Sequence, residues 1–91
     1  MIELIWDDKF KRIFKKWSQK HPDLKEQFRD KLELFVSNPF HPFLKTHRLS
    51  GVLKGTWAMR INYEQRLVFE FVDKEKKKIL LIDIGTHREV Y

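Results

Sequence analysis

The chain has 91 residues, of which 42% are apolar and 35% charged, and its formal net charge is +6. This length predicts one domain over residues 1–91, and an apolar fraction that includes eight Phe and three Trp excludes a disordered chain. No apolar run approaches the roughly 18 residues of a membrane span, and no signal peptide is recognisable. We expect a cytoplasmic protein with no membrane partner, whose positive charge attracts polyanions such as nucleic acid.

The first part of the chain carries the patterns of one strand and two helices. Apolar residues alternate over residues 2–6, which predicts a short opening strand. After two carboxylates that can cap a helix, apolar side chains recur at helical spacing to about residue 20. A second apolar stripe runs from Pro22, as the first helical residue, to a stop at 38–39. Because only a tight turn fits between them, we expect an antiparallel helical hairpin.

The second part of the chain has the alternation of a sheet. Three segments alternate between apolar and polar residues and predict antiparallel strands, over residues 57–62, 67–71 and 79–84. Turns are expected at 63–65 and 73–77, and a further turn at Gly85. Residues 47–53 predict either a further strand or an extended lead-in to the sheet.

These elements predict an α+β fold. It has a short N-terminal strand and an antiparallel helical hairpin packed on one face of a four-stranded, mainly antiparallel sheet. Each helix has one apolar stripe to bury, so the opposite face of the sheet is expected to be open. Arg60 and Arg66 belong to this open face, and the residues after the last strand can fold onto the same surface.

One set of side chains stands out as a candidate site. It consists of His47, Arg60, Arg66, His87, Arg88 and Tyr91. Guanidinium groups bind phosphate with two hydrogen bonds, imidazoles titrate near neutral pH, and an aromatic ring can stack on an unstacked base. These are the groups that RNA cleavage without a metal requires. The alternative is that the arginines face water and the tyrosine closes the core.

Other chemistry finds little support in the sequence. The four histidines lack the spacing of a zinc site and there is no Cys, so we expect neither a metal nor another cofactor. The glycines at 51 and 55 do not have the spacing of a phosphate-binding loop, and a turn between strands explains them better.

Cations of the first helix and of two loops form a second candidate surface. Lys11, Lys15, Lys54 and Arg88 could contact RNA phosphates, which would make binding strongly dependent on salt. The alternative for the helix lysines is an ordinary solvated face.

Two segments, RLVFEF (66–71) and IDIGTHREVY (82–91), resemble the RelE superfamily of bacterial and archaeal type II toxins, and most of all its RelE and YafQ branches. The likeness extends over nearly the whole chain. Arg66 falls on the arginine of the family's R-L-V-[YF] strand, and Arg60 lies where these toxins commonly have a basic residue. His47 in THRLSG and His87 in GTH match histidines of YafQ-like members, and Tyr91 corresponds to the terminal aromatic residue.

The resemblance implies an mRNA endonuclease that enters the ribosomal A site and is held inactive by a cognate antitoxin. A ribose 2′-hydroxyl would attack the adjacent phosphate, giving a 2′,3′-cyclic phosphate and a free 5′-hydroxyl. His47 is then the favoured general base and His87 the general acid. Arg66, helped by Arg60, would stabilise the charged phosphorane, and Tyr91 would orient the nucleotide or stack on it.

Some assignments stay open. YafQ-like members have a histidine at about the position of Arg60 and an aspartate near Glu64, so Glu64 is an alternative base. A ParE-like inhibitor of DNA gyrase would have the same fold, but ParE members usually end in a basic HGRR-type segment, so the ending GTHREVY favours the nuclease. A third possibility is a non-catalytic module whose cations dock on ribosomal RNA or an acidic partner.

Overall fold

The computed structural model describes residues 2–51 and 55–91. The candidate phosphate contact Lys54 and the last residues of the predicted segment 47–53 therefore lie outside the described residues. In chain order, the elements are β1 (Glu3–Ile5), α1 (Asp8–Lys20), η1 (Pro22–Leu24), α2 (Lys25–Ser37), η2 (Pro42–Leu44), β2 (His47–Arg48), β3 (Trp57–Arg60), β4 (Gln65–Phe71), β5 (Lys78–Thr86) and α3 (His87–Val90). None of the described helices is long and apolar enough to cross a membrane.

The first helix begins and ends where the sequence predicts. The Asp7 carboxylate accepts a hydrogen bond from the backbone N–H of Phe10 at 2.8 Å, which satisfies one of the free donors at the start of α1. Phe10 and Trp17 are buried, whereas the lysines of α1 remain exposed. The amphipathic pattern thus fixes which side of α1 packs on the sheet.

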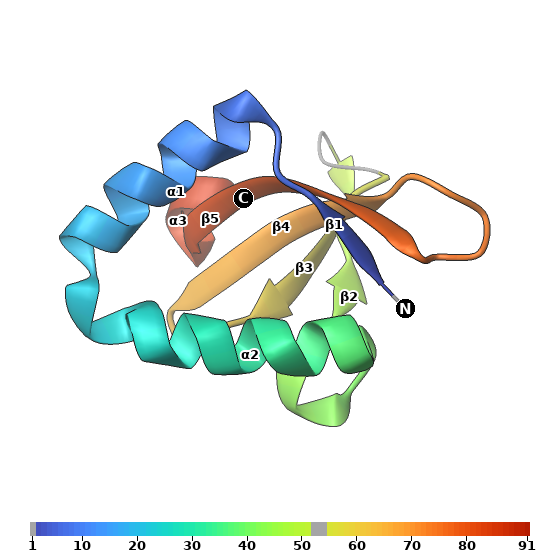
Figure 1. Cartoon of the computed structure of the whole chain (residues 1–91), viewed down its shortest axis with the longest axis horizontal. Helices are drawn as coiled ribbons and strands as arrows, with labels where there is room; N and C mark the ends of the chain where they lie inside the picture. Colours follow the sequence, from blue (N-terminus) through green and yellow to red (C-terminus); the bar gives the residue numbers. More distant parts are fainter. Residues whose placement is uncertain (1, 52–54) are drawn as a thin grey trace.

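The second helix begins later than predicted. Pro22 starts a single 3-10 turn, in which the N–H of Leu24 bonds to the carbonyl of His21, and α2 follows from Lys25. The two helices touch near this connection, where the rings of Phe14 and Phe28 lie 4.8 Å apart, and they diverge further away from it (Figure 1). The predicted hairpin is therefore present, with its two arms spread over the sheet.

The sheet has five strands rather than the predicted four, in the order β1-β5-β4-β3-β2. β1 pairs in parallel with β5, and β2 pairs antiparallel with β3, so both short segments join the central antiparallel hairpins (Figure 1). β2 pairs with β3 over only two residues, and so short a strand shows no clear alternation in the sequence. Residues 47–53 could therefore be predicted only as a strand or a lead-in.

The turn between β3 and β4 lies at residues 61–64, and not at 63–65. Gln65 belongs to β4 and is buried. Its burial is tolerated because its Oε1 accepts a hydrogen bond from the indole Nε1 of Trp17 at 2.9 Å. The Asn62 side chain closes the turn by accepting bonds from the N–H groups of Glu64 and Gln65, at 2.9 and 2.8 Å.

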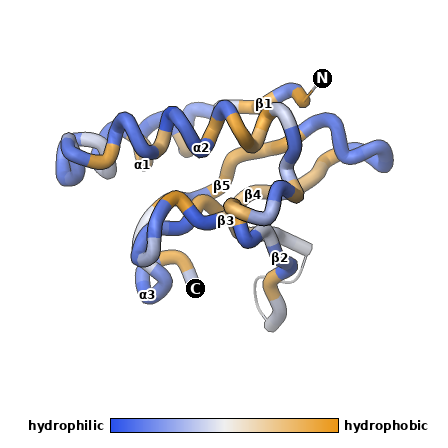
Figure 2. Tube along the Cα trace, turned by 90° about the horizontal axis from the view of Figure 1, so that it is seen from below, coloured by the Kyte–Doolittle hydropathy of each residue, from blue (hydrophilic) through white to orange (hydrophobic). Residues whose placement is uncertain are grey.

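The core lies between the two long helices and the sheet. Its members are aromatic and aliphatic side chains from both layers, among them Phe10, Trp17, Phe28, Phe35, Met59, Leu67, Phe69, Ile79 and Leu81. Figure 2 shows the apolar sides of α1 and α2 turned toward the sheet. The hydrophobic effect over these residues therefore orients the layers and leaves the second face of the sheet to other elements.

That second face is not entirely open, since the unpredicted helix α3 and the C-terminus lie beneath it (Figure 2). Gly85 makes no turn and continues β5. A Cβ at this position would lie 3.0 Å from Oε1 of Glu89 and 3.3 Å from Cγ1 of Val90. Glycine is thus needed here for the close approach of α3 to β5, and Val90 is buried by that approach.

Candidate active site

Two arginines stand side by side on the face that α3 partly covers. Arg60 of β3 is paired directly with Arg66 of β4, which is paired in turn with Gly85 of β5. Like charges in directly opposite positions destabilise a sheet, so this pair has a cost that a bound anion would remove. The absence of a side chain at Gly85 leaves room for the C-terminal residues beside Arg66.

A cavity of about 420 Å³ opens next to this pair. Its lining comes from the β3–β4 hairpin and from the start of α3, and consists of Arg60, Tyr63, Glu64, Arg66, Thr86, His87 and Arg88. Four of the predicted site residues therefore line one cavity. The alternative base Glu64 lines it as well.

The guanidinium group of Arg66 is held by backbone carbonyls. Its Nη1 donates to the carbonyl oxygens of Tyr63 at 2.8 Å and Asn62 at 3.0 Å. Burial raises the pKa of the Tyr91 phenol above its ordinary value of 10.0, while the charge of Arg66 and a hydrogen bond with it offset part of the rise. Tyr91 is therefore a neutral phenol at physiological pH, in contact with a fixed cation.

Tyr91 lies between the two candidate imidazoles. Its hydroxyl is 3.4 Å from Nε2 of His47, and its ring centroid is 4.2 Å from that of His87 in an edge-to-face arrangement. Nδ1 of His47 lies 2.9 Å from the carbonyl oxygen of Lys45. Because a carbonyl can only accept, Nδ1 carries the hydrogen, and Nε2 of the neutral ring presents its lone pair toward Tyr91.

The position of His87 depends on how α3 begins. The Thr86 hydroxyl accepts a bond from the N–H of Glu89 at 3.2 Å, and the Glu89 carboxylate accepts one from the N–H of Thr86 at 2.8 Å. This capping box lowers the pKa of Glu89, chiefly through the bond from the Thr86 backbone. His87 follows as the first residue of the helix and remains exposed.

The other predicted residues fall into two groups. Arg88 lines the cavity, but Lys11 and Lys15 are exposed on α1, on the opposite side of the sheet from α3 (Figure 2). Within the described residues, the single ion pair joins Arg29 and Glu26 at 3.9 Å, so neither Lys11 nor Lys15 takes part in an ion pair. The helix cations thus form a surface separate from the arginine cavity.

Tyr63 is a lining residue for which the sequence predicts only a place in a turn. Its side chain is 82% exposed, and Cζ of Arg60 lies over its ring, 5.5 Å from the centroid. The signal that could have found it is an aromatic residue placed between two strands that each carry an arginine on the same face.

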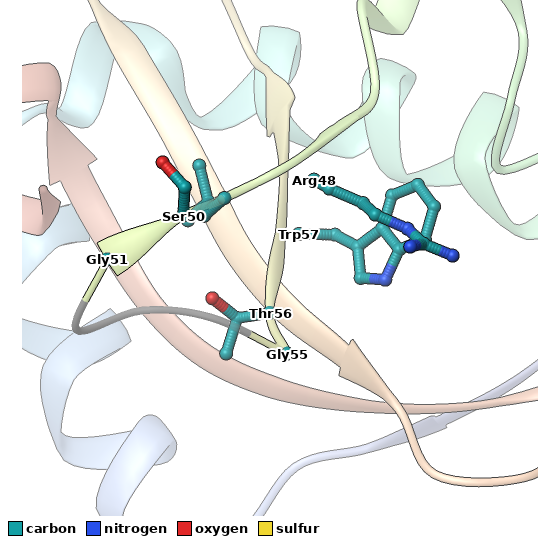
Figure 3. A pocket seen from close by; sticks show the side chains of 7 residues that line it. Arg48, Ser50, Gly51, Gly55, Thr56 and Trp57 are labelled. Atoms are coloured by element: carbon teal, nitrogen blue, oxygen red, sulfur yellow. The ribbon is translucent and has the colours of Figure 1, made fainter.

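A second cavity, of about 480 Å³, lies beside β2 and β3. Figure 3 shows Arg48 extended along Trp57, and its Cζ lies 5.1 Å from the centre of that ring. None of the catalytic candidates is among its described lining residues. No cluster of three or more His, Asp or Glu side chains that could hold a metal ion occurs within residues 2–51 and 55–91.

Neither a protein-family profile nor a curated protein sequence matches this chain. Solved structures do match it over its full length. YafQ from E. coli strain BL21(DE3) is 20% identical with a TM-score of 0.75, covering 100% of this chain and 97% of that chain. A metal-bound toxin from Helicobacter pylori is 25% identical with a TM-score of 0.72, covering 100% of both chains. YoeB in the YoeB-YefM complex from Staphylococcus aureus is 22% identical with a TM-score of 0.69, covering 96% of this chain and 98% of that chain. The chain therefore has the fold of the RelE superfamily of type II toxins, as the segments RLVFEF and IDIGTHREVY predict.

Proposed function

We propose that this protein is the toxin of a type II toxin-antitoxin system and cleaves mRNA on the ribosome without a metal ion. The observation that carries the proposal is the meeting of His47, Arg66 and the C-terminal pair His87 and Tyr91, from three separate parts of the chain, at one end of the sheet. The fold shared with YafQ and YoeB supports it.

The tautomer of His47 favours this residue as the general base. Its Nδ1–H is held by the Lys45 carbonyl, and a ribose 2′-hydroxyl that displaces the Tyr91 hydroxyl from Nε2 gives its proton to that nitrogen. The resulting oxygen attacks the adjacent phosphorus while the bond to the 5′ oxygen breaks. His87, in its protonated form, gives its proton to that leaving oxygen, so that a 2′,3′-cyclic phosphate and a 5′-hydroxyl are formed.

The arginines supply the electrostatic part of the mechanism. Negative charge accumulates on the non-bridging oxygens as the phosphorane forms, and Arg60 and Arg66 lie together at the cavity where those oxygens would bind. The carbonyl contacts of Arg66 fix its guanidinium before substrate arrives, so little reorganisation is needed. Tyr91 would hold His47 in place before the substrate binds and then contact the nucleotide.

The charge of the chain suggests how the toxin is recruited and restrained. A net charge of +6 and the exposed lysines of α1 suit docking on ribosomal RNA in the cytoplasm. The cognate antitoxin would be a second protein with an acidic and apolar segment that covers the basic surface, as complementary charge favours. The YoeB-YefM complex provides a precedent for such a pair with this fold.

The test is cleavage of ribosome-bound message, mapped by primer extension. Losing a general acid costs about 10² to 10⁴ in rate, and losing a charge-stabilising donor about 10² to 10³. We expect His87→Gln and Arg66→Ala to show these losses while their circular dichroism stays that of the wild type. Arg29→Ala, which removes an exposed cation of α2 outside the lining of the cavity, is the matched control and should cut normally.

Three outcomes would contradict the proposal. Wild-type cleavage by the folded double variant Arg66→Ala/His87→Gln would show that the site is wrong. Inhibition of gyrase supercoiling without cuts in the message would select the ParE-like function. Ribosome binding without either effect would select the non-catalytic module.

A further inference from the structure

Tyr63 is an aromatic side chain at the candidate site that the mechanism above does not use. A solvated tyrosine by itself needs no explanation. Tyr63 differs because its ring, 82% exposed, stands at the mouth of a cavity that also presents Arg60 and Arg66. An accessible aromatic ring beside phosphate-binding cations is the combination that single-stranded nucleic acid recognition uses.

One face of the Tyr63 ring is covered by Arg60. The guanidinium carbon of Arg60 lies over it, 5.5 Å from the centroid, as in a cation–π contact. Because so much of the Tyr63 side chain is solvated, the other face can receive a planar partner. A base stacked on this free face would place the Tyr63 ring between the base and the Arg60 guanidinium group.

The backbone of Tyr63 is tied to the proposed phosphate-binding group. Nη1 of Arg66 donates to the Tyr63 carbonyl at 2.8 Å, and Asn62 closes the turn through the N–H groups of Glu64 and Gln65. The backbone from which the ring projects is therefore pre-organised and held beside Arg66. Stacking on such a support loses less conformational entropy than stacking on a flexible loop.

A further cavity lies on the other side of the turn. Its volume is about 360 Å³, and its lining residues are His21, Asp23, Leu24, Asn62, Tyr63, Glu64 and Gln65. Tyr63 and Glu64 line both cavities and thus form the ridge between them. A strand whose phosphate sits at the arginines can cross this ridge with one base on the Tyr63 ring.

We propose that Tyr63 is the stacking platform for the base of the nucleotide whose phosphate Arg60 and Arg66 bind, and that it selects single-stranded RNA with an unstacked base. This inference rests on the proposed function, because it assumes an RNA substrate. Every base has a π-face, so the contact adds affinity for single strands without reading their sequence.

The probe is a short single-stranded oligonucleotide of 2′-O-methyl ribose, which lacks the attacking hydroxyl and cannot be cleaved. A second probe has the same number of phosphates and only abasic sugars. Binding of both is measured by fluorescence anisotropy for wild-type protein, Tyr63→Ala and Tyr63→Phe. Phe43→Ala is the control, because Phe43 is 71% exposed and packs against His41, outside both cavities.

We expect Tyr63→Ala to bind the base-containing probe about 10-fold more weakly, since stacking contributes about 1–3 kcal/mol per base. Tyr63→Phe and Phe43→Ala should bind it like the wild type. With the abasic probe, Tyr63→Ala should equal the wild type. The dependence on salt should not change, because no phosphate contact is removed.

Equal binding of the base-containing probe by wild type and Tyr63→Ala would overturn the stacking role. The stacking role would also be overturned if the wild type bound the base-containing and the abasic probe equally well. If either result is obtained while Arg66→Ala still loses cleavage of the message, only the role of Tyr63 is wrong and the proposed function is still supported. If the wild-type protein bound neither probe and cut no message, the proposed function would fail, and the role of Tyr63 with it.

Discussion

At the scale of single residues, Tyr91 connects the parts of the site. Its hydroxyl reaches Nε2 of His47, its ring packs on His87, and its phenol contacts Arg66. A phenol keeps its proton at neutral pH, and burial raises the pKa of this one further, so its hydroxyl acts as a hydrogen-bond donor. Its ring and its hydroxyl therefore have separable roles, one in packing and one in orientation.

Tyr91→Phe tests this separation. The ring still packs on His87, but the contacts of the hydroxyl with His47 and Arg66 are lost. A hydrogen bond contributes about 0.5–1.5 kcal/mol, so we expect single-turnover cleavage to slow by roughly 2- to 10-fold. Tyr91→Ala, which also removes the ring, should lose more. A loss beyond 100-fold in Tyr91→Phe would mean that the phenol itself transfers a proton.

At the scale of elements, the short helix α3 positions the C-terminal part of the site. Its four residues are too few to be stable alone, so its geometry depends on the capping box of Thr86 and Glu89 and on the close packing over Gly85. The pKa of Glu89 is lowered by the hydrogen bonds with Thr86. A carboxylate with a depressed pKa in the folded state stabilises that state above its unfolded pKa, here near 4.5.

We therefore expect α3 to loosen as the pH falls below about 4.5 and the carboxylate of Glu89 is protonated. Amide hydrogen exchange at Val90 and Tyr91 would rise in this range. Glu89→Gln is the matched control, because its amide oxygen can cap the helix but does not titrate. If the wild type and Glu89→Gln showed the same pH dependence, another group would be responsible.

At the scale of the whole molecule, the two faces of the sheet have different surfaces. One carries α1 and α2, with exposed Lys11 and Lys15, and the other carries the arginine cavity under α3 (Figure 2). The proposed docking and the proposed chemistry should therefore respond to different substitutions. Phosphate contacts by surface lysines act through counterion release, so they affect binding and its dependence on salt.

The double variant Lys11→Glu/Lys15→Glu should weaken ribosome binding and reduce the slope of log affinity against log salt by about 2. Single-turnover cleavage at saturating ribosomes should stay unchanged. Lys74→Glu/Lys77→Glu makes the same change of charge in the β4–β5 hairpin, where we expect a solvated loop, and serves as the control. Identical sedimentation of both double variants with ribosomes would remove the role of α1.

The sequence by itself determined the elements whose signal is local. The spacing from Phe10 to Trp17 and the Asp7 cap fixed α1, and alternation placed Arg60 and Arg66 on one face, because the period of a strand is two residues. The tertiary structure alone decided that Tyr91 meets His47, 44 residues away, that β2 joins the sheet, and that Gly85 accommodates α3. These contacts depend on strand register and on packing between distant segments, and the side-chain pattern of one segment carries no information about its distant partner.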